Sequence, residues 1–236
     1  HCTDELLSAS PAQVASVLAE KVKPAPGEWL SLWRERERAV ERILYEEAPA
    51  EAKIIDALSD GLPSDGLLFS GNSLAIRQLD WFFSGREQSL RIFCNRGASG
   101  IDGNVATLLG MASVNKGPVV GLLGDLTLQH DIGALAEARD LNAVILVTDN
   151  GGGAIFDHLA QAGLDEHEEL FVTPRRIDLG AMAKAFGLGY LRAEPDQLAG
   201  ELHGALQKPG VQLLHVEIDR QQSRDEHGAL WARLLK

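Results

Sequence analysis

Short apolar runs of strand length alternate with helix-like segments through most of this 236-residue chain. Six runs qualify as strands, at 66–70, 90–94, 119–125, 143–149, 189–193 and 211–218. Segments with helical spacing fall between them, at 101–113, 132–140, 179–187 and 195–207. Parallel strands need crossover connections, which are usually helices. The pattern therefore predicts an α/β fold: a doubly wound parallel sheet with helices on both faces.

The part before residue 63 has a different pattern. Residues 22–28 (VKPAPGE) carry two prolines and a glycine, which is typical of a linker. Apolar residues at helical spacing then predict one helix over 29–47 and another that ends at Gly61. We expect a tail and linker over 1–28, connecting helices over 29–62, and the main domain over 63–236.

The charge balance excludes some classes of partner. Lys and Arg total 22 against 34 Asp and Glu, a net charge of −12, which opposes binding to nucleic acid or to an anionic membrane. No apolar run is long enough to span a bilayer, and Cys2 and Cys94 do not form a disulfide framework. We expect a cytoplasmic protein in which an anionic substrate needs a local basic pocket.

Loops rich in glycine and polar residues follow the predicted strands, where open parallel sheets bind their ligands. They are SGNS at 70–73, NRGASGIDG at 95–103, GDLT at 124–127 and DNGGG at 149–153. None has the lysine of a P-loop or the G-x-G-x-x-G of a dinucleotide site, so ATP and nicotinamide are disfavoured. The histidines lack the spacing of zinc ligands.

Two of these loops together predict a metal and phosphate site. A phosphate fits the turn from Gly124 through Leu126 and Thr127, because backbone N–H groups can face an anion there. Asp125, Asn150 and the carbonyl of Gly152 would give Mg²⁺ oxygen ligands. The alternative is that Asp125 only caps a helix and that Asn150 only forms a turn.

The two loops resemble the signature of thiamine diphosphate enzymes, GDG followed by NN. Leu126 and Asp149 depart from that signature in ways that resemble the branch of 2-succinyl-5-enolpyruvyl-6-hydroxy-3-cyclohexene-1-carboxylate (SEPHCHC) synthases. The resemblance extends over about 67–190 and includes LFSGNSLAIRQLD, NRGASGIDG, GGAIF and FVTPRRIDLGAMAKAFGLGY. It implies the thiamine diphosphate-binding fold for 63–236, with thiamine diphosphate and Mg²⁺ (or Mn²⁺) as cofactors.

The same resemblance implies roles for individual residues. The cofactor-binding positions are Gly100, Ile101, Gly124, Asp125, Leu126, Thr127, Asn150, Gly152 and Gly153, of which Asp125, Asn150 and Gly152 would hold the metal. The substrate side has two groups, Arg77, Arg96 and Ser73 for carboxylates, and Ile155, Phe156 and Leu159 as an apolar pocket. Taken without the motifs, the two arginines would be ordinary surface charges and the apolar residues ordinary core.

The implied reaction joins the succinyl unit of 2-oxoglutarate, after loss of CO₂, to isochorismate in menaquinone biosynthesis. His130 lies beside the cofactor loop and suits either acid/base chemistry or, with Asp131, the ordering of a turn.

In this family a glutamate on a separate pyrimidine-binding domain activates the cofactor, which binds between subunits. The pattern gives no such domain in the chain, so we expect it to be inactive alone and to act within a homodimer or tetramer. The alternatives are another 2-oxoacid decarboxylase or acetolactate synthase relative, and a non-catalytic truncated module of the same fold.

Overall fold

The computed structural model describes residues 7–84, 90–174 and 177–235, and these form two units. The first unit is His1–Ile43 and holds α1 (Pro11–Lys21) and most of α2 (Gly27–Glu46), with no buried residue in either helix. The second unit, Leu44–Lys236, begins with the end of α2 and with α3 (Ala50–Gly61). The domain limits at 28 and 62 stay predictions.

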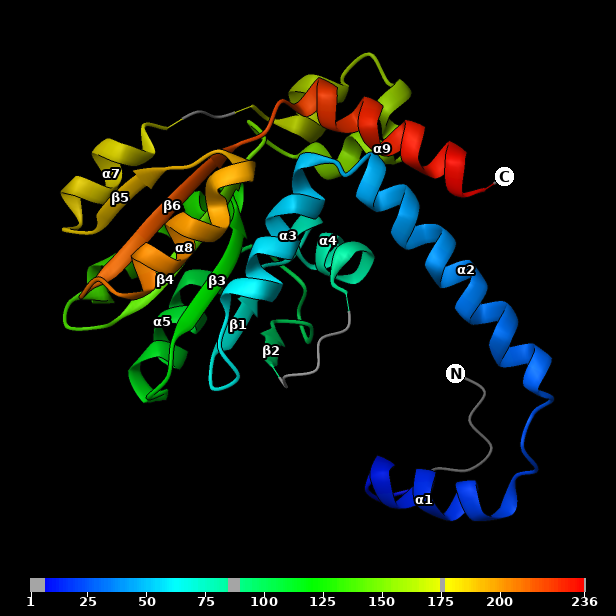
Figure 1. The fold of residues 1–236 in the computed structure, drawn as a ribbon. Helices are drawn as coiled ribbons and strands as arrows, with labels where there is room; N and C mark the ends of the chain where they lie inside the picture. The colour runs from blue at the N-terminus through cyan, green and yellow to red at the C-terminus, as the bar shows by residue number, and fades with distance from the viewer. Residues whose placement is uncertain (1–6, 85–89, 175–176, 236) are drawn as a thin grey trace. The chain divides into compact units, whose positions relative to one another are not determined.

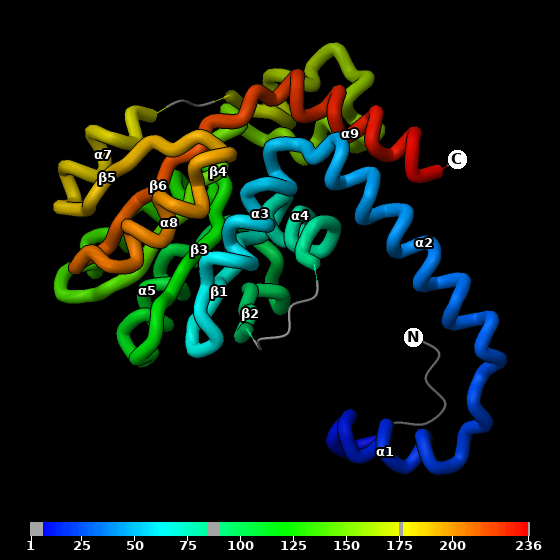
Figure 2. Tube along the Cα trace, viewed as in Figure 1, coloured from blue at the N-terminus to red at the C-terminus, as the bar shows by residue number. Residues whose placement is uncertain are grey.

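The second unit is built on a six-stranded sheet in which every described pair of strands is parallel. Its order is β2-β1-β3-β4-β6-β5, so β6 lies between β4 and β5 (Figure 2). The strand bounds are β1 Leu67–Ser70, β2 Arg91–Cys94, β3 Val119–Gly124, β4 Ala143–Asp149, β5 Gly189–Arg192 and β6 Val211–Glu217. All six predicted strands are confirmed.

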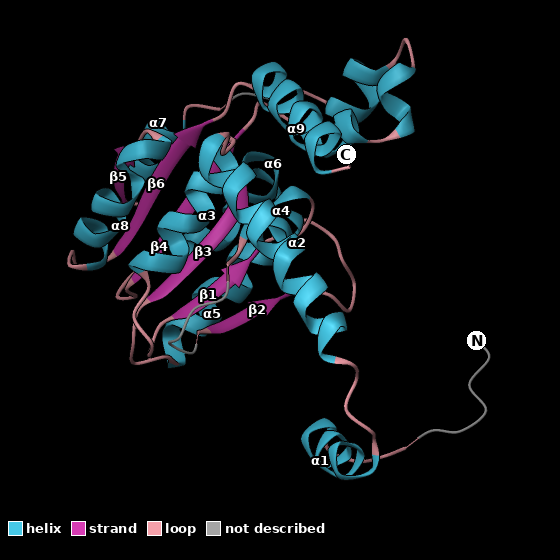
Figure 3. Ribbon diagram, turned by 45° about the vertical axis from the view of Figure 1, so that its right-hand side comes forward, coloured by secondary structure: helices cyan, strands magenta, loops and turns pink. Residues whose placement is uncertain are grey.

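Helices cover both faces of the sheet, as Figures 1 and 3 show. One face carries α3, α4 (Leu74–Phe82) and α8 (Leu198–Leu206), which pack on one another and on the central strands. The other carries α5 (Asn104–Val114), α6 (Asp125–His130), the 3-10 helix η1 (Ile132–Ala138) and α7 (Leu179–Ala185) around one apolar core. The doubly wound α/β fold is therefore confirmed.

Some local predictions need correction. The segment 132–140, predicted as an α-helix, forms the 3-10 helix η1, and residues 101–103 of the segment 101–113 precede α5. The pattern also missed α4 and α9 (Arg220–Leu234), and residues 195–197 of the predicted helical segment 195–207 form the 3-10 helix η5 (Pro195–Gln197). Between β4 and α7 it gave no element, where η2 (Ala154–His158), η3 (Ala160–Gly163) and the π-helix η4 (His167–Val172) lie.

Two expectations drawn from composition can be compared with the described residues. Cys94 is a free thiol, while Cys2 lies outside the ranges that the structure describes. No helix in those ranges is both long enough and apolar enough to cross a bilayer.

The packing of α3 gives a first prediction. Leu58 is fully buried in a helix that packs on α4 and α8, so Leu58→Ala should lower the free energy of unfolding by about 2–5 kcal/mol. Each kcal/mol corresponds to about 2–4 °C in Tm for a domain of this size, and a thermal melt measures the fall. The matched change in α2, Leu32→Ala, removes a half-exposed side chain and should leave Tm nearly unchanged. Equal Tm for both variants would contradict the packing of α3.

Candidate functional site

The site lies at the carboxyl ends of three neighbouring parallel strands. Ser70 of β1 pairs with Leu122 of β3, and Gly124 of β3 pairs with Thr148 of β4. The order of the strands across the sheet reverses between β1 and β3, because β2 lies on one side of β1 and β3 on the other. This topological switch point leaves a crevice at the carboxyl ends of the strands, where open α/β sheets bind ligands.

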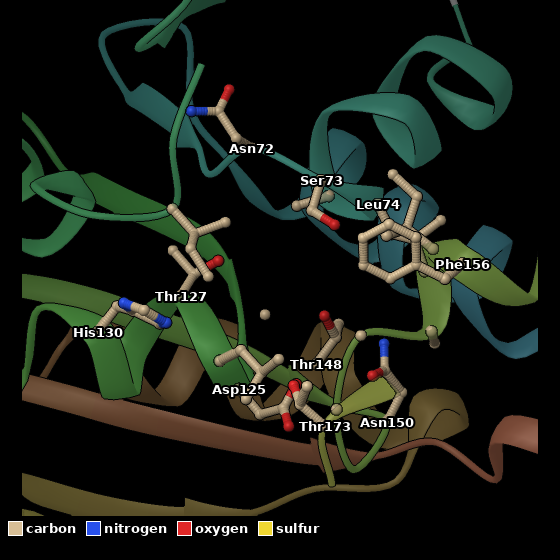
Figure 4. Close-up of a pocket in the computed structure, with 18 of the residues that line it drawn as sticks. Asn72, Ser73, Leu74, Asp125, Thr127, His130, Thr148, Asn150, Phe156 and Thr173 are labelled. Carbon is tan, nitrogen blue, oxygen red and sulfur yellow. The ribbon is translucent and has the colours of Figure 1, made fainter. Parts of the chain in front are cut away.

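A cavity of about 530 Å³ occupies this crevice. Loops after β1, β2, β3 and β4 line it, and Figure 4 shows ten of the lining side chains by name. In that view Asp125, Thr148, Asn150 and Thr173 gather at one end, while Phe156 lies beside Leu74 and Ser73.

Asp125, the first residue of α6, is buried with 3% of its surface exposed. Burial raises the pKa of its carboxyl to about 7, and the charge of Asp149 adds to the rise. Backbone N–H groups of Leu126, of Asp125 itself and of Gly152 donate to the carboxylate and act in the opposite direction. A nearby cation would also favour the charged form.

Two oxygens of the predicted metal ligands are buried without a hydrogen-bond partner among the described residues. They are Oδ2 of Asp125 and Oδ1 of Asn150, on the loops after β3 and β4. An ionised carboxylate oxygen and an amide oxygen only accept hydrogen bonds, so a cation would satisfy both where the protein's own donors do not. The described ranges hold no group of three His, Cys, Asp or Glu side chains suited to a metal, but a carboxylate, an amide and a carbonyl form a different ligand set.

Asp149 is held by contacts on the far side of the Asn150 loop. Its carboxylate accepts from the N–H of Gly151 at 3.0 Å and lies 3.1 Å from Nε2 of His215. Nδ1 of that histidine is 3.0 Å from the hydroxyl of Tyr190, so β4, β5 and β6 are joined by one chain of hydrogen bonds. The loop that carries Asn150 is thereby fixed from its own strand and from two others.

The glycines at 152 and 153 let two backbone segments meet. Gly152 has φ 146°, and a Cβ there would lie 2.5 Å from the carbonyl oxygen of Val172. A Cβ on Gly153 would lie 2.5 Å from the carbonyl oxygen of Phe171, and its N–H donates to Val172 at 2.7 Å. Residues 154–172, here called the wall segment, can pack against residues 149–153 only because Gly152 and Gly153 lack side chains.

The wall segment supplies the apolar side of the cavity. Ile155 and Phe156 come from η2, and Leu170 and Phe171 come from η4. The rings of Phe156 and Phe171 pack edge to face with centroids 5.4 Å apart.

On the opposite side, Asn72 connects the loops after β1 and β2. Its amide group is buried and donates to the carbonyls of Asn95 at 3.0 Å and Gly100 at 2.6 Å. Its Oδ1 accepts a hydrogen bond from Nη1 of Arg96 at 3.0 Å. Asn72 therefore orients the guanidinium of Arg96 at the edge of the cavity.

Arg77 approaches the cavity from α4, and its Nη1 donates to the carbonyl of Ser73 at 2.8 Å. Ser73 has φ 67°, a left-handed conformation that costs a residue with a side chain about 1–3 kcal/mol. The strained backbone holds the serine hydroxyl at the cavity, where a glycine would be easier to accommodate.

The cavity brings most of the predicted site residues together. It is lined by Ser73, Arg77, Arg96, Ile101, Gly124, Asp125, Leu126, Thr127, Asn150, Gly152, Gly153, Ile155 and Phe156. Gly100 and Leu159 do not line it: Gly100 acts through its carbonyl, which accepts from Asn72, and Leu159 is 46% exposed. The roles assigned to all fifteen stay predictions.

His130 also lines the cavity, while Asp131 has a structural partner. Oδ2 of Asp131 accepts from the N–H of Ala106 in the first turn of α5, at 2.9 Å. The turn-ordering role thus has a contact in the structure, and the acid/base role of His130 stays a prediction.

Other lining residues were missed from the sequence, among them Asn72, Thr148, Phe171 and Thr173. Two could have been found, because Asn72 follows a predicted strand directly and Thr148 lies near the end of another. Phe171 and Thr173 had no such signal, since they reach the cavity only through the fold of the wall segment and the loop after it.

Comparison with known proteins identifies relatives of the chain. Two curated SEPHCHC synthases, from Dechloromonas aromatica and Desulfitobacterium hafniense, are 41% and 36% identical to the chain over 89% and 86% of its length. The chain spans 38% of the length of each of these relatives. The predicted resemblance to SEPHCHC synthases is therefore confirmed.

A solved structure and a family model also match the chain. The structure of benzoylformate decarboxylase from Polynucleobacter necessarius matches 71% of this chain and 32% of its own with a TM-score of 0.59, at 20% identity, which shows the common fold. Residues 81–216 match the family model of the thiamine pyrophosphate enzyme, C-terminal TPP-binding domain. Thiamine pyrophosphate (TPP) is another name for thiamine diphosphate. The chain therefore belongs to the thiamine pyrophosphate enzymes and contains the C-terminal, cofactor-binding domain of that family.

Proposed function

We propose that the chain is the diphosphate- and Mg²⁺-binding part of a SEPHCHC synthase. The whole enzyme would decarboxylate 2-oxoglutarate and add the succinyl unit to isochorismate in menaquinone biosynthesis. The observation that carries the proposal is the pair of buried, unpartnered oxygens on Asp125 and Asn150, at the end of a cavity that two arginines also line.

The residues at this end fit the cofactor and its metal. Oδ2 of Asp125, Oδ1 of Asn150 and the carbonyl of Gly152 would hold Mg²⁺, or Mn²⁺, which also prefers oxygen ligands. The turn from Gly124 to Thr127 would face the diphosphate, and Ile101 would contact the cofactor from the loop after β2. When bound, thiamine diphosphate supplies the stabilisation of a carbanion that no side chain provides.

The remaining residues favour anionic substrates. Arg77 and Arg96 put two guanidinium groups beside one cavity in a chain with a net charge of −12, and guanidinium binds carboxylates in a bidentate manner. Ser73 adds a hydroxyl donor, while Ile155 and Phe156 exclude water from the other side. A decarboxylase that makes small neutral products has no use for this pair of arginines, which favours the synthase over that alternative.

The proposal extends to how the enzyme is assembled. We propose that a pyrimidine-binding region, not recognisable in these 236 residues, completes the site across a dimer or tetramer in the cytoplasm. The chain alone would then be inactive and would bind the cofactor weakly. A non-catalytic module predicts instead no binding of thiamine diphosphate and Mg²⁺ even after the pyrimidine-binding region is supplied.

Asp125→Asn tests the metal assignment. The variant should lose Mg²⁺-dependent binding of thiamine diphosphate, measured by calorimetry in an enzyme that includes the pyrimidine-binding region. Its metal-free form should also be more stable. The folded pKa of Asp125, about 7, lies above the unfolded value of 3.8. Ionisation of this buried carboxyl is therefore unfavourable in the folded state, and the native protein loses stability as pH rises through this range. At pH 8 we expect the free energy of unfolding of the metal-free variant to be higher by about 1–3 kcal/mol. Each kcal/mol raises Tm by about 2–4 °C, so a thermal melt measures the gain.

The surface change Asp225→Asn on α9 is the control, and neither cofactor affinity nor Tm should respond to it. Undiminished cofactor affinity in Asp125→Asn would refute the metal assignment, whatever its Tm.

Arg96→Lys tests substrate binding. Lysine keeps the charge but cannot bind a carboxylate with two parallel N–H groups, so KM for isochorismate or for 2-oxoglutarate should rise about tenfold. Affinity for thiamine diphosphate should not change. Arg91→Lys is a matched control, because Arg91 lies on the same edge of the sheet and bonds Asn115 instead of lining the cavity. Kinetics that match those of the unaltered enzyme for both acids would place Arg96 outside the substrate site.

A further inference from the structure

A buried carboxylate outside the cavity ties the wall segment to the rest of the domain. The side chain of Asp157, at the end of η2, is 5% exposed. Its Oδ1 lies 2.7 Å from Nε2 of His167 in η4, and its Oδ2 lies 3.4 Å from Nε of Arg220 on α9. One side chain thus joins the two ends of the wall segment to each other and to α9.

Arg220 makes a second contact with the same segment. Its Nη2 donates to Oε2 of Glu168 in η4 at 2.7 Å, so a single guanidinium spans two carboxylates of the wall segment. The planar group of arginine presents its donors in a fixed fork, which sets the spacing between the carboxylates that it binds. Removing it would leave Asp157 buried with one partner fewer, which is costly for a charged group.

These contacts lead directly to the aromatic side chains of the cavity. Asp157 follows Phe156 in the chain, and the ring of Phe156 packs on Phe171. The ring of His167 stacks on Phe171 with centroids 6.2 Å apart and planes 19° apart. A shift of Asp157 or His167 would therefore move a ring that lines the cavity, although neither residue lines it.

We propose that Arg220 is a positioning residue for the substrate side of the cavity. It holds the wall segment through Asp157 and Glu168, and so sets where Phe156 and Phe171 stand relative to the two arginines across the cavity. α9 lies outside the cavity, yet through this contact it controls the shape of the apolar pocket. This role rests on the proposed function, since it assumes that the pocket receives a substrate.

The test compares Arg220→Ala and Arg220→Lys with Arg224→Ala, a change at an exposed arginine one turn further along α9. Hydrogen exchange of the chain reports the wall segment through the N–H of Gly153, which is bonded to Val172, and through the amides of η4. Steady-state kinetics of the enzyme with its pyrimidine-binding region report the cavity. Calorimetry reports the affinity for thiamine diphosphate with Mg²⁺.

In Arg220→Ala we expect faster exchange confined to the wall segment and the Gly153 amide. KM for isochorismate should rise about tenfold or more, because a small displacement of a positioning group has an effect of this size. Cofactor affinity should be unchanged. Arg220→Lys should recover part of the loss in KM, and Arg224→Ala should match the unaltered enzyme in all three measurements.

The proposal is overturned if exchange and KM in Arg220→Ala stay as in the unaltered enzyme. It is equally overturned if exchange accelerates throughout the domain and cofactor affinity falls, since Arg220 would then be a general stabilising contact. If the unaltered enzyme does not turn over isochorismate, the proposed function fails separately. Faster exchange confined to the wall segment would in that case still support the anchoring role, and its absence would still refute it.

Discussion

Parallel pairing of β1, β3 and β4 is the constraint on which the site depends. The pairing of Ser70 with Leu122 and of Gly124 with Thr148 brings the carboxyl ends of the three strands to the same side of the sheet. Each end continues into a polar loop, and the order of the strands across the sheet reverses at this point. Residues that lie 50 or more positions apart, such as Ser73 and Asp125, therefore line one cavity. A slip in this register would separate them without changing any strand by itself.

The electrostatics of the site oppose the folded chain's own stability. Asp125 is buried near Asp149, and its pKa of about 7 reflects both the burial and that second charge. The chain nevertheless holds Asp149 firmly through His215 and Gly151. Two carboxyl groups so close together, one of them buried, lower the stability of the folded chain. A bound cation would neutralise this charge, so the arrangement is typical of a binding site. The strained backbone of Ser73, on the opposite side of the cavity, also lowers stability and is also typical of a functional site.

Much of the fold and of the site could be predicted because both follow from strands and their ends. Apolar runs predicted all six strands, the loops after them predicted Asp125 and Asn150, and the family motif NRGASGIDG predicted Arg96. The wall segment could not be predicted in the same way, because 3-10 and π turns lack the periodicity of an α-helix. The contact from Arg220 to Asp157 joins residues more than 60 positions apart, and no local pattern announces such a pair.

The lack of side chains at Gly152 and Gly153 determines which residues around the cavity can be substituted independently of one another. The wall segment meets residues 149–153 through the carbonyl oxygens of Phe171 and Val172, and the side chains of Val172 and Phe156 also lie against these glycines. Ile155 is not among the groups nearest to Gly152 or Gly153, so a substitution there can alter the cavity lining without disturbing that contact. The loop that carries Asn150 can therefore stay constant while the apolar lining of the cavity changes at Ile155.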